Sequence, residues 1–196
     1  MLWCPFDAHG AQSGPDVQVR WRDSAGVGEA LTEPSLPQVV GDSGYVPEPC
    51  VLDPEQVVEH EYRELLDEDL QQRIEAWDAA AEEQAEESHD DEADIVTYDH
   101  DLSIAPGWKI GGYASWSVTG PTNTTCSCGE PMHLLLRVDS REWDSGTPSW
   151  IPLEDRDLTN EPEANAPTRV TVGRGGSLNV FACSSDPTHE HRTSIQ

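Results

Sequence analysis

The amino-acid sequence predicts an α+β protein, built mainly of antiparallel β-strands with one acidic amphipathic helix or helix pair. The second half of the chain holds short runs of β-branched and aromatic residues separated by glycines, which is typical of antiparallel strands. The helical region is indicated by Leu66, Leu70, Ile74 and Trp77, which recur at helical spacing on one face.

The first half of the chain contains one strand pattern and one helix pattern. Residues 17–21 alternate apolar and polar side chains, which predicts a half-buried strand. Prolines and glycines between positions 34 and 49 then favour irregular structure. Asp67 is a suitable N-cap for a helix that continues to about Glu87. Within this helix no large apolar residue follows Trp77, so we expect its second half to be exposed or frayed. We expect residues 88–94 to form an acidic linker.

The second half of the chain contains several candidate strands. Residues 108–118 are rich in aromatic and β-branched side chains around a glycine pair, and residues 132–138 read as a core strand. Residues 169–172 and 178–182 are expected to form a hairpin through the glycines between them. Residues 144–167 contain prolines and are expected to form a long loop.

Acidic residues are unevenly distributed along the chain. The 196 residues include 38 Asp and Glu against 11 Lys and Arg, for a formal net charge of −27. Residues 53–94 hold 18 of those 38 acidic residues, with Arg63 and Arg73 as their only basic residues. We therefore divide the chain into a strand-and-loop part (1–52), an acidic helical segment with its linker (53–94) and a β-rich part (95–196).

The overall charge excludes some classes of partner. A sequence-independent nucleic-acid binder neutralises phosphates with Lys and Arg, which are scarce here. No polybasic segment is present to bind an anionic membrane surface, and no apolar run approaches the ~18–20 residues that span a bilayer. The N-terminal residues lack the features of a secretory signal, so we expect a cytoplasmic protein.

Cysteine and histidine residues form the sharpest candidate site. Cys126 and Cys128 lie in a turn just before the 132–138 strand, and Cys183 ends the 178–182 strand. His189 follows shortly after, with His191 as an alternate ligand. If the two strands are neighbours, three sulfurs and one imidazole converge, which is a donor set that suits structural zinc. The alternative is that these residues are free thiols and surface histidines of a cytosolic protein.

Support for catalysis is weaker. The sequence has no Gly-x-Ser-x-Gly elbow, no phosphate-binding glycine loop before a helix and no His-Glu-x-x-His motif. The strongest enzyme hypothesis is a metal- or thiol-dependent hydrolase that uses Cys183, His189 and His191. Metal binding accounts for Cys183 and His189 and also for Cys126 and Cys128. We therefore favour a protein that is not an enzyme.

Two sets of residues are candidates for partner binding. Trp143 and Trp150 bracket a short loop, where aromatic side chains either contact partners or cover a small core. The acidic helix carries a group of glutamates that would suit a basic protein partner. This group consists of Glu82, Glu83, Glu86 and Glu87.

The β-rich part resembles a known family. Three motifs occur in a characteristic order: Trp108-Lys-Ile-Gly-Gly112 with Trp116, Cys126-Ser-Cys128-Gly leading into Met132 and Leu134-Leu-Leu136, and Leu178-Asn-Val-Phe-Ala-Cys183. This order resembles the YwqG-like family of bacterial proteins of unknown function, in an actinobacterial branch. It is more distantly similar to the C-terminal-type domain of the eukaryotic programmed-cell-death-protein-two family. The resemblance covers residues 105–196.

The resemblance implies a mostly β, α+β fold and a role in protein interaction. The eukaryotic relatives are implicated in escorting a newly made ribosomal protein, and many bacterial ones are suspected immunity or interaction proteins. The family's zinc knuckle carries over to Cys126, Cys128 and Cys183, with His189 in place of a fourth cysteine. Two departures are a Cys-x-Cys that is one residue shorter than the family's Cys-x-x-Cys, and Ser115 where the family has proline. Relatives usually have another half upstream, so this chain looks like a C-terminal portion.

The sequence therefore predicts a non-enzymatic, cytoplasmic protein-interaction module of a chaperone-like or immunity type. Its expected partner is a protein, which the acidic segment suggests is basic, and its expected cofactor is one structural zinc ion.

Overall fold

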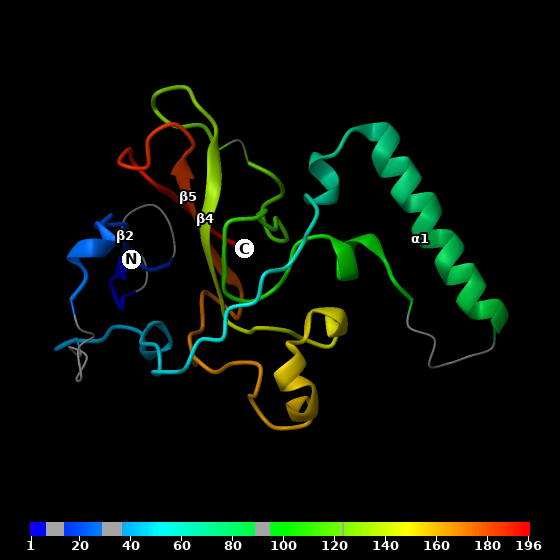
Figure 1. Cartoon of the computed structure of the whole chain (residues 1–196), viewed down its shortest axis with the longest axis horizontal. Coiled ribbons are helices and arrows are strands. Elements are labelled where there is room, and N and C mark those ends of the chain that lie inside the picture. Colours follow the sequence, from blue (N-terminus) through cyan, green and yellow to red (C-terminus); the bar gives the residue numbers. More distant parts are fainter. Residues whose placement is uncertain (7–13, 29–36, 89–94, 123) are drawn as a thin grey trace.

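A four-stranded antiparallel sheet forms the centre of the protein (Figure 1). The computed structural model describes residues 1–6, 14–28, 37–88, 95–122 and 124–196. The sheet has the strand order β3-β4-β5-β6, and strands β1 and β2 pair separately in a two-stranded antiparallel sheet. The predicted α+β class with mainly antiparallel strands is confirmed. The strands are β1 (Leu2–Trp3), β2 (Val17–Gln18), β3 (Lys109–Ile110), β4 (Met132–Asp139), β5 (Ser177–Cys183) and β6 (Arg192–Ile195), and the long helix is α1 (Glu68–Ser88).

A β-bulge shapes the central strand pair. Met132 pairs with Cys183, Leu134 with Phe181 and Leu136 with Val180. Between the last two pairs, β4 advances by two residues while β5 advances by only one. Leu135 is therefore the extra residue on β4. Because side chains alternate between the two faces of a strand, this extra residue reverses which face of the sheet the following β4 side chains occupy.

The bulge divides the core between the two faces of the sheet. On one face, Met132 and Leu134 pack with Phe181 and Cys183 in a cluster that also contains Trp116. The stacked rings of Trp116 and Phe181 lie 5.7 Å apart. The other face is covered by a second cluster, which consists of Val17, Val138, Val170, Val172, Leu178 and Val180. Strand β5 is consequently buried on both of its faces, which explains why apolar residues follow one another without alternation from Val180 to Cys183.

Several predicted strands are shorter than the sequence pattern suggests. The strand expected at 17–21 is limited to β2, and the strand expected at 108–118 is limited to β3. Strand β3 ends because Gly111 and Gly112 both adopt left-handed backbone angles, with φ of 75° and 73°. Residues 169–172 form no hairpin strand, since Val172 has only a single bridge to Gly176 and the segment bonds instead to Gly44 through Thr171. Strand β6 was not predicted.

Helix α1 begins where the sequence predicts. The side chain of Asp67 accepts a hydrogen bond of 2.9 Å from the backbone N–H of Leu70, as an N-cap should. Ile74 is buried, but Trp77 is 44% exposed, so the expected apolar stripe stops one turn early. Asp78 faces the body of the protein in its place, where its carboxylate pairs with Arg63 and accepts the Tyr98 backbone N–H.

The second half of α1 is helical to Ser88 and lies at the periphery of the molecule (Figure 1). The acidic linker that was expected at 88–94 lies outside the described residues beyond Ser88. Among the described helices, none combines the length and the apolar character that a membrane span requires.

Glu59 joins the acidic segment to the sheet. Its carboxylate, almost entirely buried, accepts hydrogen bonds of 2.6 Å from the Lys109 ammonium and from the backbone N–H groups of Ala105 and Tyr113. Burial lowers the pKa of Lys109 to about 8, although the hydrogen bond to Glu59 favours its charged form. Strand β3 and the Gly111-Gly112 turn are thus held by one carboxylate from a distant part of the chain.

The two glycines of this turn provide a matched test of that contact. A Cβ at Gly112 would overlap Glu59 Oε1, whereas a Cβ at Gly111 would meet open space. Both alanine variants adopt a left-handed conformation at a cost of about 1–2 kcal/mol. Gly112→Ala also displaces the Glu59 carboxylate from its donors, and each donor left unsatisfied adds about 1–3 kcal/mol. We expect urea denaturation to show a clearly larger loss of stability for Gly112→Ala. Equal losses would show that Glu59 does not constrain the turn.

Candidate metal centre

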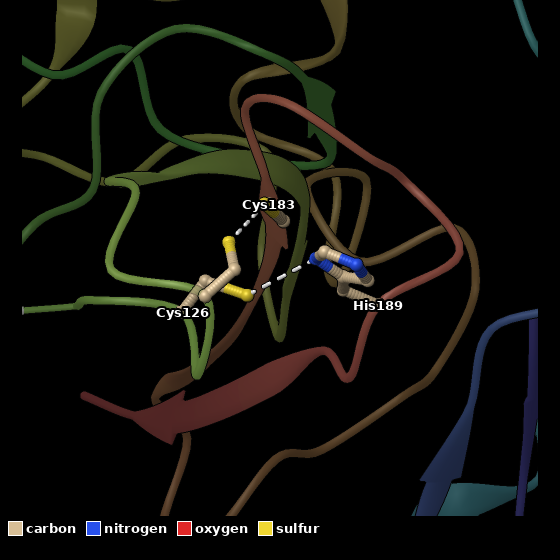
Figure 2. A group of neighbouring side chains, drawn as sticks. Cys126, Cys183 and His189 are labelled. Carbon is tan, nitrogen blue, oxygen red and sulfur yellow. Dashed lines mark hydrogen bonds between the residues drawn. The ribbon is translucent and has the colours of Figure 1, made fainter.

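Four predicted ligands meet at one end of the β4–β5 pair. Ligand atoms of Cys126, Cys128, Cys183 and His189 all lie within 4.8 Å of one another. Figure 2 labels Cys126, Cys183 and His189 where they converge. The register explains three of them, because Met132 at the start of β4 is opposite Cys183 at the end of β5. The turn with Cys126 and Cys128 directly precedes β4, and it therefore reaches the same end of the sheet.

The Cys126–Cys128 turn is closed by backbone hydrogen bonds. The N–H of Cys126 donates to Glu130 O, and the N–H of Gly129 donates to Cys126 O, both at 2.9 Å. Gly129 has a φ of 91°, which a residue with a side chain rarely adopts. The turn leaves Cys126 buried and Cys128 exposed.

A second turn positions His189. Asp186 O accepts the His189 backbone N–H, and the Asp186 carboxylate accepts the N–H and hydroxyl of Thr188 at 2.8 and 2.7 Å. The imidazole then presents Nδ1 to Cys126 Sγ at 3.5 Å and Nε2 to Asp186 Oδ2 at 3.6 Å. A carboxylate behind a ligating histidine fixes the ring orientation and increases its basicity.

The donor spacing fits a tetrahedral zinc ion. With Zn–S bonds of about 2.3 Å and Zn–N bonds of about 2.0 Å, a tetrahedron separates two sulfurs by about 3.8 Å and a sulfur from a nitrogen by about 3.5 Å. Cys128 Sγ lies 3.6 Å from Cys183 Sγ, and Cys126 Sγ lies 3.5 Å from His189 Nδ1. The residues present therefore fit zinc in donor type and number, and these two separations match a tetrahedron.

Backbone N–H groups face the sulfurs and favour thiolates. A hydrogen bond from the Cys128 backbone lowers the pKa of Cys126 to about 6. Bonds from the Asp186 and Ser185 backbones lower the pKa of Cys183. The Glu130 backbone also lowers the pKa of Cys128, but the neighbouring thiol of Cys126 and burial raise it more. Such N–H groups stabilise the deprotonated form that binds metal.

His191 lies outside this group. Its Nε2 atom is 2.7 Å from the carbonyl oxygen of Val17, so the ring contacts β2. The structure thus places His189, and not the alternate His191, among the cysteines. Of the three residues in the hydrolase hypothesis, only Cys183 and His189 belong to this cluster.

The tryptophans expected to contact a partner are engaged within the protein. Trp143 is only 6% exposed, so of the two alternatives for its ring, contact with a partner or covering a small core, its burial favours the second. It lies inside because the 144–167 loop folds back, where the Asn165 side chain donates to Trp143 O. Trp150 is half-buried, and its indole N–H donates to His100 O. The acidic helix residues Glu82, Glu83, Glu86 and Glu87 are all exposed.

Two contributors to these contacts were not identified in the sequence. Asp186 supports His189 from three residues upstream, a spacing that could have been noticed in an Asp-Pro turn. Glu59 is one of many glutamates in its segment, and nothing local marks it as buried. Comparison of the chain with protein-family models, with curated proteins and with solved structures found no match.

The two exposed cysteines give a matched test of metal binding. We expect the purified protein to hold one zinc ion with three sulfur ligands and one nitrogen ligand, as X-ray absorption would show. Cys128→Ser removes one ligand and should release zinc to a chelator at least 100-fold more readily, whereas Cys50→Ser, outside the cluster, should not. Equal zinc retention in both variants would exclude Cys128 as a ligand.

Asp186 should affect metal affinity without binding the metal. Asp186→Asn keeps the shape of the turn but weakens the support of the imidazole. We therefore expect about 10- to 100-fold lower zinc affinity with unchanged stoichiometry, measured by competition with a chromophoric chelator. Asp157→Asn, an exposed aspartate far from the cluster in sequence, is the control. An affinity that Asp186→Asn leaves unchanged would contradict this role.

Proposed function

We propose that this protein is a non-enzymatic protein-interaction module stabilised by one structural zinc ion. The observation that supports this most is the complete Cys3His donor set. Four protein ligands fill a tetrahedron, whereas catalytic zinc sites keep one position for water or substrate. Two of the sulfurs also belong to an apolar core cluster, so the ion would join core elements and not line a substrate cleft.

The surface proposed for partner binding is the acidic helix face, defined as Glu82, Glu83, Glu86 and Glu87 on α1. These positions repeat one helical turn apart, so their carboxylates lie along one side of the helix. The middle of the helix is held by Asp78 through Arg63 and Tyr98, and the half of α1 beyond it lies at the periphery of the molecule. Such a face attracts a basic protein and increases its association rate.

A chaperone-like or immunity-type role in the cytoplasm completes the proposal. The five cysteines are all free thiols, as expected in a reducing compartment. The membership in the YwqG-like family that the motif order predicts would support the same class of function. A basic client suits both roles, because an acidic surface can screen the charges of a protein before assembly or block those of a toxin.

Charge neutralisation on the acidic helix face tests the partner hypothesis. A variant with Glu82, Glu83, Glu86 and Glu87 all replaced by Gln should recover fewer basic proteins from a native lysate at low salt. We expect captured partners to decrease several-fold, and the remaining binding to depend less on salt, because screened attraction contributes most of the encounter.

The control changes the same net charge elsewhere. Asp53, Glu55, Glu154 and Asp157 are exposed, and their replacement by Asn or Gln also removes four negative charges. If both variants lose partners equally, total charge and not the helix face governs binding. If the unmodified protein does not capture basic proteins preferentially, the proposed partner class is wrong.

A thiol-dependent hydrolase is the second candidate, and one observation favours it. The pKa of Cys183 is lowered, first by the backbone N–H groups of Asp186 and Ser185 and then by His189, as a nucleophile paired with a base requires. Cys183 is nevertheless buried. Rapid labelling of Cys183 by a thiol reagent in metal-free protein would favour the hydrolase, whereas protection by one equivalent of zinc would favour the structural site.

A further inference from the structure

A polar pocket lies on the same sheet face as the metal cluster, toward the other end of β4. Its volume is about 550 Å³, within the range of small-molecule sites. Arg137 and Asp139 of β4 line it, together with residues from segments near positions 63, 103, 115 and 176. The Leu135 bulge is responsible, because it turns Arg137 and Asp139 toward the face that Met132 and Leu134 occupy before the bulge.

The pocket wall contains a nearly buried ion pair. Asp139 Oδ2 accepts hydrogen bonds from Nε and Nη2 of Arg137 at 2.9 and 2.6 Å, and Arg137 Nη1 donates to Ser115 Oγ at 2.9 Å. Both side chains are only about one-tenth exposed. A buried ion pair is seldom a source of stability, so its place in a pocket wall calls for another role. The Arg137 guanidinium retains two N–H bonds that these partners do not use.

Two unsatisfied buried atoms belong to the same region. Within the described residues, the buried side-chain polar atoms without a hydrogen-bond partner are Arg63 Nε and Asn179 Oδ1. Arg63 lines the pocket. Asn179 is opposite Arg137 in the sheet register, and its side-chain amide donates to the backbone carbonyl of Ser115, a lining residue. An unsatisfied buried polar group destabilises a fold by about 1–3 kcal/mol, and such groups concentrate at functional sites.

The charges of the lining have both signs. Three of the ten arginines of this very acidic chain, Arg63, Arg137 and Arg141, line the pocket. Arg141 is exposed and forms no ion pair with a described residue, and the same holds for the Glu64 carboxylate of the lining. Asp99 is partly neutralised by Arg63 at 2.9 Å. Asp144 also lines the pocket without an ion pair, so the site offers cationic donors and two carboxylates, Glu64 and Asp144, that form no ion pair with a described residue.

A ligand that carries only one charge would leave half of these groups unused. A simple anion would also enter against the field of a chain with net charge −27. A zwitterion satisfies both sets, with its carboxylate at Arg137 and Arg141 and its ammonium at Glu64 and Asp99. Tyr62 and Trp143 add aromatic surface to the lining. We propose that this pocket binds a small zwitterion of the amino-acid or dipeptide class.

The experiment uses the full chain and the dipeptide Gly-Phe, with its N-acetylated and C-amidated forms as single-charge analogues. Calorimetric or NMR titration should show binding of Gly-Phe, with each capped form about tenfold weaker, as expected for the loss of one charge-assisted contact. No binding of Gly-Phe at millimolar concentration, or equal binding of the capped forms, would overturn the proposal.

Arg141→Gln tests the position of the site. Arg141 is exposed, so the variant should fold normally, and we expect about tenfold weaker binding of Gly-Phe. Arg156→Gln, an exposed arginine outside the lining, should bind as the parent protein does. Unchanged binding in Arg141→Gln would overturn the assignment to this pocket. Zinc content and capture of basic proteins should be the same in both variants, which separates this proposal from the proposed function.

Discussion

The pairing of β4 with β5, and the one-residue bulge within it, is the constraint on which the rest of the structure depends. Before Leu135, β4 contributes Met132 and Leu134 to the face that carries the cysteines. After Leu135, the apolar side chains of β4 cover the opposite face, while Arg137 and Asp139 lie on the face that carries the cysteines. A regular strand would place Leu134, Leu136 and Val138 on one face and leave the second cluster without its β4 members.

The bulge also explains why the sheet has two chemically different ends on one face. The Cys126 end is apolar and holds thiols, while the Arg137 end holds ion pairs. Lys109, opposite Arg137 in the register, joins this polar end and is balanced by Glu59. The acidic segment is therefore tied to the sheet at an end where the sheet presents cations. The nearly buried Glu59 carboxylate has a structural task, while Glu82, Glu83, Glu86 and Glu87 of α1 are exposed.

Much of this arrangement could be predicted from local patterns. The Asp67 cap, the 132–138 strand and the convergence of Cys126, Cys128, Cys183 and His189 each follow from residue types at short spacing or at the ends of two adjacent strands. The failures concern long-range effects. Whether Trp77 is buried depends on what α1 packs against, and the length of β3 depends on φ angles that the glycines permit but do not require. Register is equally non-local, since no residue around Leu135 signals an unpaired position.

The apolar surroundings of the cysteines link the candidate metal centre to the stability of the fold. Cys126 and Cys183 are buried with Trp116, Met132 and Phe181, where isolated thiolates would be costly. The backbone N–H groups at the sulfurs offset part of that cost and favour deprotonation before any metal arrives. A divalent cation among three thiolates would leave one net negative charge where there were three, in a chain that already carries −27. Zinc would thus reduce the negative charge that the thiolates place in the apolar core. Its binding free energy would add directly to that of folding.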